Sequence, residues 1–260
     1  MTRAAPLATW YEQHGRHDLP WRATRDPWAV LVSEVMLQQT QVGRVLVTWA
    51  PFMARFPTAA ATAAAPLGAV IGAWGRLGYP RRARRLWESA RVIAESGWPD
   101  DLTVLPGVGR YTAAAIRAQA HDADVPAAEV NIRRVVQRVE GRILGERAVE
   151  AASRRVGRGL AGRNRLLALM DLGATVCTAR APSCPTCPLR RRCASRGPLA
   201  GEARTRQPTF AGSFRQRRGI VMARLRAEPA VAVAELNAEA LTSLVADGLA
   251  VVDCGAARLP

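Results

Sequence analysis

The chain has 260 residues, and 49% of them are hydrophobic, which is enough to build one or two hydrophobic cores. It carries 37 basic and 21 acidic residues, a net charge of +16 and a pI near 11.4. Such a field favours a polyanionic partner such as DNA or RNA, although a solvated arginine-rich surface is the alternative. Every basic residue is arginine, which excludes catalysis through a lysine Schiff base. The sequence shows neither a secretory signal nor a long apolar run, so we expect a cytoplasmic, nucleoid-associated protein without a membrane.

Helical periodicity runs through most of the chain, with prolines marking turns and helix starts. The predicted helices span residues 5–14, 27–38, 41–55, 66–73, 81–96, 108–120, 129–139, 148–160 and 164–176. Residues 195–218 are rich in Gly, Pro, Ser and Arg and are expected to form a linker. Short helices are then expected over 219–226, 229–235 and 237–247, followed by a hairpin after Asp247-Gly248. Helices followed by a small β-wing indicate a winged-helix-like extension.

Glu34 lies in the apolar predicted helix 27–38. An exposed glutamate is the ordinary alternative at such a position. If the side chain is buried, loss of solvation raises the pKa of the carboxyl group. A carboxyl that stays protonated near neutral pH is what general-acid catalysis requires, so Glu34 is a candidate acid.

A Pro-Gly-x-Gly turn comes directly before an alanine-rich helix. Its glycines allow close approach, and the first amide N–H groups of the helix point outward, which suits a phosphate. An ordinary turn with a capping glycine is the alternative. In a strongly basic chain the pattern indicates a helix-hairpin-helix motif, which grips the DNA backbone without reading sequence. The residues expected to bind DNA here are Gly107, Val108, Gly109 and Arg110.

The cysteines near residue 185 indicate a metal centre. Cys177, Cys184, Cys187 and Cys193 are separated by six, two and five residues. A structural zinc site usually shows two CxxC pairs, whereas this chain has one, so the spacing favours a [4Fe–4S] cluster and leaves zinc as the alternative. Cys254 stands alone and is expected to be a small buried hydrophobe.

Three consecutive arginines separate the last two of these cysteines. A loop held by metal would present Arg190, Arg191 and Arg192 to phosphate with little further loss of entropy. The alternative is a solvated basic loop.

Four stretches taken together resemble the helix-hairpin-helix DNA glycosylases that carry an iron–sulfur cluster, and most closely the MutY-like adenine glycosylases. They are residues 18–22 (DLPWR), 33–42 (SEVMLQQTQV), 74–79 (WGRLGY) and 168–174 (ALMDLGA). The likeness spans residues 7–195. It implies a mainly α, two-lobed fold, with a six-helix barrel lobe over 16–120 and a cluster lobe formed by 1–15 and 121–197. Residues 198–260 would form the linker and the small C-terminal domain.

The resemblance also implies a function: base excision repair, with adenine removed opposite 8-oxoguanine or guanine by hydrolysis of the N-glycosidic bond. The partner would be double-stranded DNA containing a lesion or mismatch, and we expect a monomer. Glu34 matches the acid that protonates adenine, and Tyr111 and Asn131 match residues that support the sugar side. The residues that match the pocket around the extruded base are Leu19, Trp21, Arg22 and Asp171. Those that match the wedge and the reading of the opposite base are Gln38, Thr40, Leu77 and Tyr79.

The second catalytic carboxylate departs from the family pattern. Glu129 and Val130 stand where the family has an aspartate followed by a small residue. The extra methylene moves the carboxylate by about 1.3–1.5 Å, an error that can cost about a hundredfold in rate. Three interpretations stay open: an adjusted, working glycosylase, a glycosylase with a different lesion or structure preference, or a non-catalytic iron–sulfur protein that binds lesions. Asp124 lies too far before Asn131 to replace the aspartate without a rebuilt loop.

Two further departures bear on activity. Tyr111 occupies the position where related strand-cutting enzymes have a lysine, which implies base removal without lysine-dependent lyase activity. About 60 residues follow the cysteines, fewer than the Nudix-like domain of many MutY proteins requires. Recognition of the opposite base would then depend on the wedge residues and the small C-terminal domain.

Overall fold

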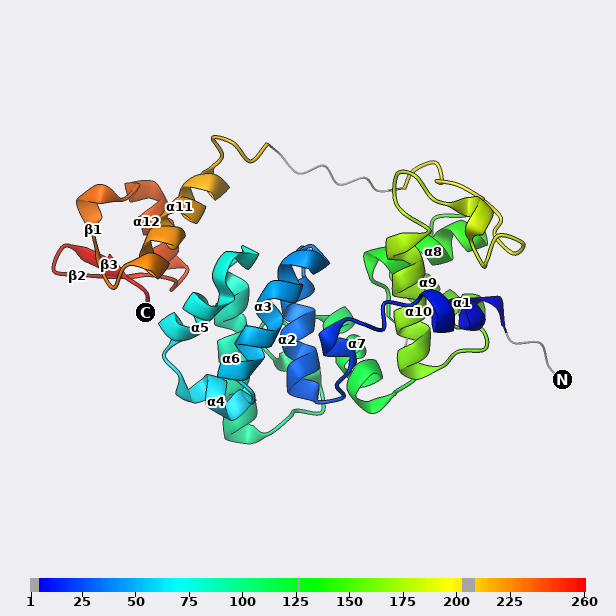
Figure 1. Ribbon diagram of the computed structural model, residues 1–260, viewed down its shortest axis with the longest axis horizontal. Helices are drawn as coiled ribbons and strands as arrows, with labels where there is room; N and C mark the ends of the chain where they lie inside the picture. Colours follow the sequence, from blue (N-terminus) through cyan, green and yellow to red (C-terminus); the bar gives the residue numbers. More distant parts are fainter. Residues whose placement is uncertain (1–4, 126, 203–208) are drawn as a thin grey trace. The chain divides into compact units, whose positions relative to one another are not determined.

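A computed structural model of the protein describes residues 5–125, 127–202 and 209–260, and in them it is mainly helical (Figure 1). The chain divides into two compact units. The first unit comprises residues 1–30 and 109–205, and the second comprises residues 31–108 and 206–260. None of the helices in the described ranges combines the length and the apolar character that a membrane span needs.

The first unit is built from helices that share one hydrophobic core. They are α1 (Pro6–His14), α7 (Arg110–His121), α8 (Val130–Glu140), α9 (Glu146–Val156) and α10 (Gly162–Thr175), with 3₁₀ turns η1 (Pro20–Arg22) and η4 (Cys184–Thr186). Helix α8 packs against α9 and α10, and α10 also contacts α7 and α1 (Figure 1). Ile132, Val136, Leu169 and Leu172 are buried in this core at three- and four-residue spacing along α8 and α10. The core holds α8 and α10 together just where the cysteine-bearing segment begins.

The second unit contains the remaining helices that precede residue 108. They are most of α2 (Pro27–Leu37), α3 (Val42–Arg55), α4 (Ala59–Ala64), α5 (Leu67–Trp74) and α6 (Arg81–Ser96), with η2 (Gly75–Leu77) and η3 (Leu102–Val104). Helix α6 packs against α4 and α5. Asp26 begins α2, because its carboxylate accepts the backbone N–H groups of Trp28 and Ala29. Pro27 then occupies the first helical turn, where its missing N–H is harmless.

The C-terminal part of the second unit has the topology of a winged helix. It runs α11 (Phe214–Ala227), β1 (Val231–Ala232), η5 (Val233–Glu235), α12 (Ala238–Ala246), β2 (Val251–Asp253) and β3 (Ala256–Arg258). The antiparallel sheet has the order β1-β3-β2. Ala257 of the central strand β3 pairs with Val231 of β1 on one side and with Val252 of β2 on the other. The Pro260 carbonyl accepts the Gly68 N–H at 2.6 Å, so the end of the chain is attached to the start of α5. This agrees with the expected winged-helix-like extension.

The predicted helices between residues 5 and 176 lie close to the observed ones, but the periodicity missed α4. This short helix is almost all alanine, so it has no apolar stripe to detect. Its start could have been found from Thr58, whose hydroxyl accepts the Ala61 N–H as an N-cap. The helix predicted to run to residue 160 ends at Val156, because Gly157 and Gly159 follow.

Three predictions beyond residue 195 are wrong. The helix expected over 229–235 is a strand and a 3₁₀ turn, because the β-branched Val231 is buried against β3 and Pro229 precedes it. Helix α11 begins at Phe214, inside the expected linker, where Ser213 caps it by accepting the Gln216 N–H. Residues 203–208 of that linker lie outside the described residues. Cys254 is exposed at φ 45° in the turn between β2 and β3, and is not a buried hydrophobe.

Candidate functional site

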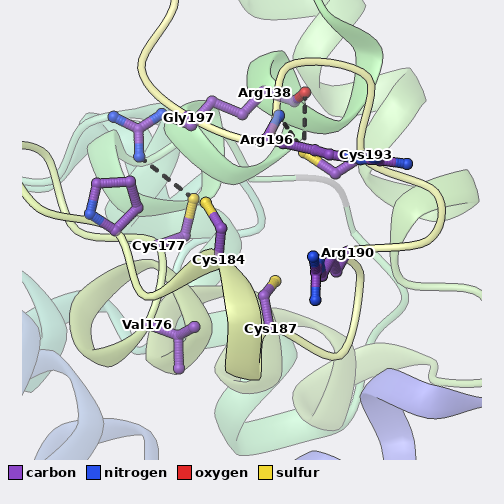
Figure 2. Close-up of a pocket in the computed structure, with 10 residues that line it drawn as sticks. Arg138, Val176, Cys177, Cys184, Cys187, Arg190, Cys193, Arg196 and Gly197 are labelled. Carbon is purple, nitrogen blue, oxygen red and sulfur yellow. Dashed lines mark hydrogen bonds between the residues drawn. The ribbon is translucent and has the colours of Figure 1, made fainter.

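The four cysteines predicted to bind metal line one pocket. Cys177 follows the end of α10, Cys184 begins η4, Cys187 ends it, and Cys193 lies in the loop beyond. Figure 2 shows their side chains around the pocket together with Arg138, Arg190 and Arg196. Four cysteines within a span of 17 residues, Cys177 to Cys193, thus line the same pocket.

The pocket is electropositive. Arg138 is 1% exposed, donates from Nη1 to the Cys177 Sγ at 3.5 Å, and forms a two-point ion pair with Glu202 at 2.7 Å per bond. Burial raises the pKa of the Cys177 thiol and raises that of Cys187 to about 11. A metal bound by these sulfurs would oppose this effect, because a coordinating thiol is deprotonated. In the described part of the chain no three His, Cys, Asp or Glu side chains are placed to hold one metal ion.

Glu129 is the N-cap of α8, and its carboxylate is well supplied with donors. Its Oε2 accepts the backbone N–H groups of Asn131 at 2.7 Å and Ile132 at 3.4 Å, and its Oε1 accepts the Asn131 Nδ2 at 2.7 Å. Burial raises the pKa of Glu129, against the opposing effect of these hydrogen bonds and of the Arg134 charge. The longer side chain is thus folded back onto the helix end, where it acts as a cap.

Arg134 links this cap to the cysteine segment. Its Nη2 donates to the Asn131 Oδ1 at 2.6 Å and to the Gly173 carbonyl at 2.5 Å, and its Nε donates to the Cys177 carbonyl at 2.6 Å. Helices α8 and α10 approach closely here, because a Cβ on Gly173 would lie 2.7 Å from the Asn131 Cβ. Nothing in the sequence indicated that Arg134 links α8 to the cysteine segment, since an arginine on a helix is normally solvated.

Two of the expected base-pocket residues form a buried ion pair. Arg22 donates to both oxygens of Asp171, at 2.6 and 2.8 Å, and Arg16 adds its backbone N–H at 2.9 Å and its Nε at 2.7 Å. Burial favours the neutral acid and would raise the pKa of Asp171. The hydrogen bonds and charges of Arg22 and Arg16 outweigh this effect, so the pKa of Asp171 is lowered. Leu19 and Trp21 are buried beside Arg22, at 5% and 2% exposure.

Glu34 is buried in an apolar helix, as general-acid chemistry requires. Its exposed fraction is 5%, which excludes the interpretation of an ordinary surface glutamate. The neighbouring residues of α2 that are at most 2% exposed are Val30, Leu31, Val32, Ser33, Val35 and Met36, all apolar except Ser33. Burial among mainly apolar side chains favours the protonated form of a carboxyl group.

The predicted wedge residues lie on two loops of the second unit. The Gln38 side chain donates to the Gly107 carbonyl at 3.3 Å, and the Thr40 hydroxyl accepts from Arg82 at 2.9 Å. Tyr79 is 40% exposed, whereas Leu77 is only 2% exposed. Tyr79 is therefore accessible to solvent, whereas Leu77 is packed inside the second unit.

The hairpin and the arginine loop have the expected local geometry. Gly107 has φ 83°, and Gly109 is the N-cap of α7. Val108 is buried at 5%, and the exposed Arg110 is paired with Glu146 and Glu150. The tyrosine predicted to support the sugar side, Tyr111, donates its hydroxyl to the Met170 sulfur at 3.4 Å. Arg190, Arg191 and Arg192 are exposed, anchored by the buried Leu189.

A profile described as the HhH-GPD superfamily of base excision DNA repair proteins matches residues 32–157. The adenine DNA glycosylase of Mycolicibacterium smegmatis is 44% identical over 269 residues, covering 94% of this chain and 90% of the relative. The chain belongs to the adenine DNA glycosylase family within the HhH-GPD superfamily. Another member of the family, the adenine DNA glycosylase of Mycobacterium tuberculosis, is 44% identical and covers 94% of this chain and 88% of its own length.

Solved structures agree with this family assignment. A thermostable thymine-DNA glycosylase superposes with a TM-score of 0.67 and 28% identity, covering 74% of this chain and 93% of its own. The helix-hairpin-helix glycosylase fold predicted from the sequence is confirmed.

Proposed function

We propose that the protein is a DNA glycosylase of base excision repair that hydrolyses the N-glycosidic bond of adenine paired with 8-oxoguanine or guanine. The substrate is double-stranded DNA. The burial of Glu34 at 5% exposure within an apolar helix is the observation that carries the proposal, because it places a carboxyl group out of bulk solvent at the position expected of the acid. The names and the extensive identity of the mycobacterial relatives support adenine as the base.

Each of the two glutamates has its own part in the proposed reaction. The adenine leaves the helix stack before it is cut. The Glu34 carboxyl donates a proton to a ring nitrogen of adenine, so the base departs as a neutral leaving group with the electron pair of the N-glycosidic bond. Glu129 stabilises the positive charge that develops on the sugar, and water then adds to C1′. The Glu129 carboxylate accepts the proton that this water loses.

The geometry around Glu129 favours the interpretation of an adjusted, working site. The additional methylene is accommodated by the cap on α8, in which three donors hold the carboxylate at 2.7–3.4 Å. Asn131 fixes one of the oxygens and is itself fixed by Arg134. A carboxylate held this firmly can be as well oriented as the shorter aspartate.

Asp171 contributes to the base pocket through Arg22. The four hydrogen bonds from Arg16 and Arg22 use the acceptor capacity of its two oxygens. The carboxylate therefore orients Arg22, and Arg22 with Trp21 and Leu19 would face the extruded base. The DNA backbone would be bound by Gly107, Val108, Gly109 and Arg110, and by Arg190, Arg191 and Arg192.

The four cysteines are proposed to hold a [4Fe–4S] cluster. They surround a shared pocket, and their spacing with a single CxxC pair suits a cluster better than zinc. When bound, the cluster would supply a rigid anchor for the loop that carries Arg190–Arg192. A purified protein absorbing near 400 nm would support the cluster, and four-coordinate zinc in its place would contradict it.

Glu34→Gln tests the proposed function directly. Duplexes with adenine opposite 8-oxoguanine or guanine are incubated with protein and treated with alkali, and strand breaks are counted. We expect breaks with the native protein and a rate lowered by about 10²–10⁴-fold in the variant, with duplex binding retained. A native protein that binds these duplexes but never releases adenine would instead be a lesion-binding protein. Breaks with uracil, hypoxanthine or bulky adducts alone would indicate another glycosylase specificity.

The same reactions test the proposed lack of lyase activity. Since the chain contains no lysine, we expect no strand breaks before alkali and no borohydride-trapped adduct. A trapped adduct would require another amine, such as the N-terminus.

A further inference from the structure

Arg82 is buried near the start of α6 and binds two loops at once. The side chain is 7% exposed, and burial lowers the pKa of its guanidinium to about 10, so it is a cation at neutral pH. Its Nη1 donates to the carbonyls of Val35, Met36 and Gln38, at 2.8, 2.9 and 2.5 Å. These carbonyls belong to the last turn of α2 and to the loop that follows it.

The other terminal nitrogen of Arg82 completes the connection. Its Nη2 donates to the Thr40 hydroxyl at 2.9 Å and to the Gly78 carbonyl at 3.1 Å. The guanidinium also lies over the rings of Trp74 and Tyr79, at 5.4 and 5.3 Å from their centroids. One side chain therefore fixes residues 38–40 relative to residues 77–79.

Both loops contain backbone conformations that L-residues rarely adopt. Gln39 has φ 55° and Tyr79 has φ 49°. Such a conformation is unfavourable for an L-residue and persists only where the surroundings enforce it, which is typical of functional sites. Gln39 and Tyr79 are also exposed, so the strained loops carry their side chains to the surface.

We propose that Arg82 is a positioning residue that holds these two loops in the conformation that contacts duplex DNA at the target base pair. An arginine suits the task because its planar fork reaches several carbonyls at once, which a lysine ammonium cannot do. Arg82 does not touch the reacting atoms; it acts through Gln38, Thr40 and Tyr79. The role in DNA contact rests on the proposed function, whereas the ordering of the loops does not.

The test compares Arg82→Met, which removes all donors, with Arg82→Lys, which keeps the charge. Arg91→Met is the matched control, because Arg91 is an exposed arginine of α6 that stacks over Trp87 at 4.9 Å. The first readout is hydrogen exchange of the backbone amides in 38–40 and 77–79. We expect at least tenfold faster exchange there in Arg82→Met, an intermediate effect in Arg82→Lys, and no change in Arg91→Met. Unchanged exchange in both Arg82 variants would overturn the proposal.

The second readout is the ratio of affinities for a duplex with adenine opposite 8-oxoguanine and for the matched duplex. A merely structural role would lower the melting temperature but leave this ratio unchanged. We expect the ratio to fall at least tenfold in Arg82→Met and partly to recover in Arg82→Lys, while the excision rate at saturating protein changes much less. A ratio within twofold of the native value in a folded Arg82→Lys and Arg82→Met would contradict the inference. If the native protein fails to excise adenine, the proposed function fails, and the exchange measurement still decides the role of Arg82 in ordering the loops.

Discussion

The two glutamates assigned to the reaction are held in opposite ways. Glu34 lies within α2, and the residues of α2 on either side of it are buried and mainly aliphatic. Glu129 lies at the end of a helix, where it accepts two backbone N–H groups and one side-chain amide, and where Arg134 is near. An aliphatic surrounding favours the protonated acid. At Glu129 the N–H donors and the Arg134 charge favour the carboxylate and oppose burial, which raises the pKa of this group.

This difference would allow two glutamates to take different parts in the proposed reaction. A proton donor must retain its proton until the base is ready to leave, and a group that stabilises a sugar cation must already be charged. The helix interior and the helix N-terminus supply these two environments without any other residue type. The predictions that follow ask whether the contrast is real and which contacts maintain it.

After Glu34→Gln, the largest effect is expected from neutralising Glu129. Glu129→Gln retains the size of the side chain but removes the negative charge, so we expect the single-turnover rate of adenine excision to fall about 10²–10³-fold. Glu129→Asp retains both the charge and the capability to cap α8, and its rate should stay within about tenfold of the native rate. A Glu129→Gln protein as active as the native one would assign the charge stabilisation to another group.

The pH dependence of kcat/KM sharpens the contrast. Because burial raises the pKa of Glu129, the carboxylate is lost as the pH falls through a value above the ordinary range of glutamate. Activity should therefore decline about tenfold per pH unit on the acid side, starting above that range. A rate that stays constant down to pH 4 would contradict a raised pKa at Glu129.

A smaller effect is expected from Asn131→Ala. This change removes the side-chain N–H that Glu129 accepts but leaves both backbone donors, so the loss should be about 1–1.5 kcal/mol, or roughly tenfold in rate. Asn237→Ala is the matched control, because Asn237 caps α12 by accepting the Ala240 N–H at 3.0 Å. The control should lose about 1 kcal/mol of stability and no excision rate. Equal excision rates in the two variants would show that the Asn131 side chain only stabilises the start of α8.

Much of the fold followed from periodicity, because most helices of this chain bury a stripe of leucine, isoleucine and valine. Helix α4 was missed because alanine carries no such signal, and the strand at Val231 was mistaken for a helix because its pairing partner Ala257 is 26 residues away. Local sequence does not report such a distant contact. The predicted division into lobes stays a prediction.

The site was predicted only where residue type and spacing are specific. Four cysteines at a fixed spacing and a glutamate in an aliphatic helix can be recognised in the sequence, and the structure brings those cysteines together and buries that glutamate. The buried Arg82 and Arg138 and the half-buried Arg134 could not be recognised among 37 arginines. Their partners are mostly backbone carbonyls, which every residue carries, so their roles exist only in the folded chain.

A double-mutant comparison of excision rates tests most directly whether both glutamates act on one bond. Single-turnover release of adenine opposite 8-oxoguanine is measured for the native protein, Glu34→Gln, Glu129→Gln and the double variant. Groups that act as a unit give losses far from additive, so we predict a double variant within about tenfold of the slower single variant. A double variant whose loss equals the product of the two single losses would contradict joint action on the N-glycosidic bond.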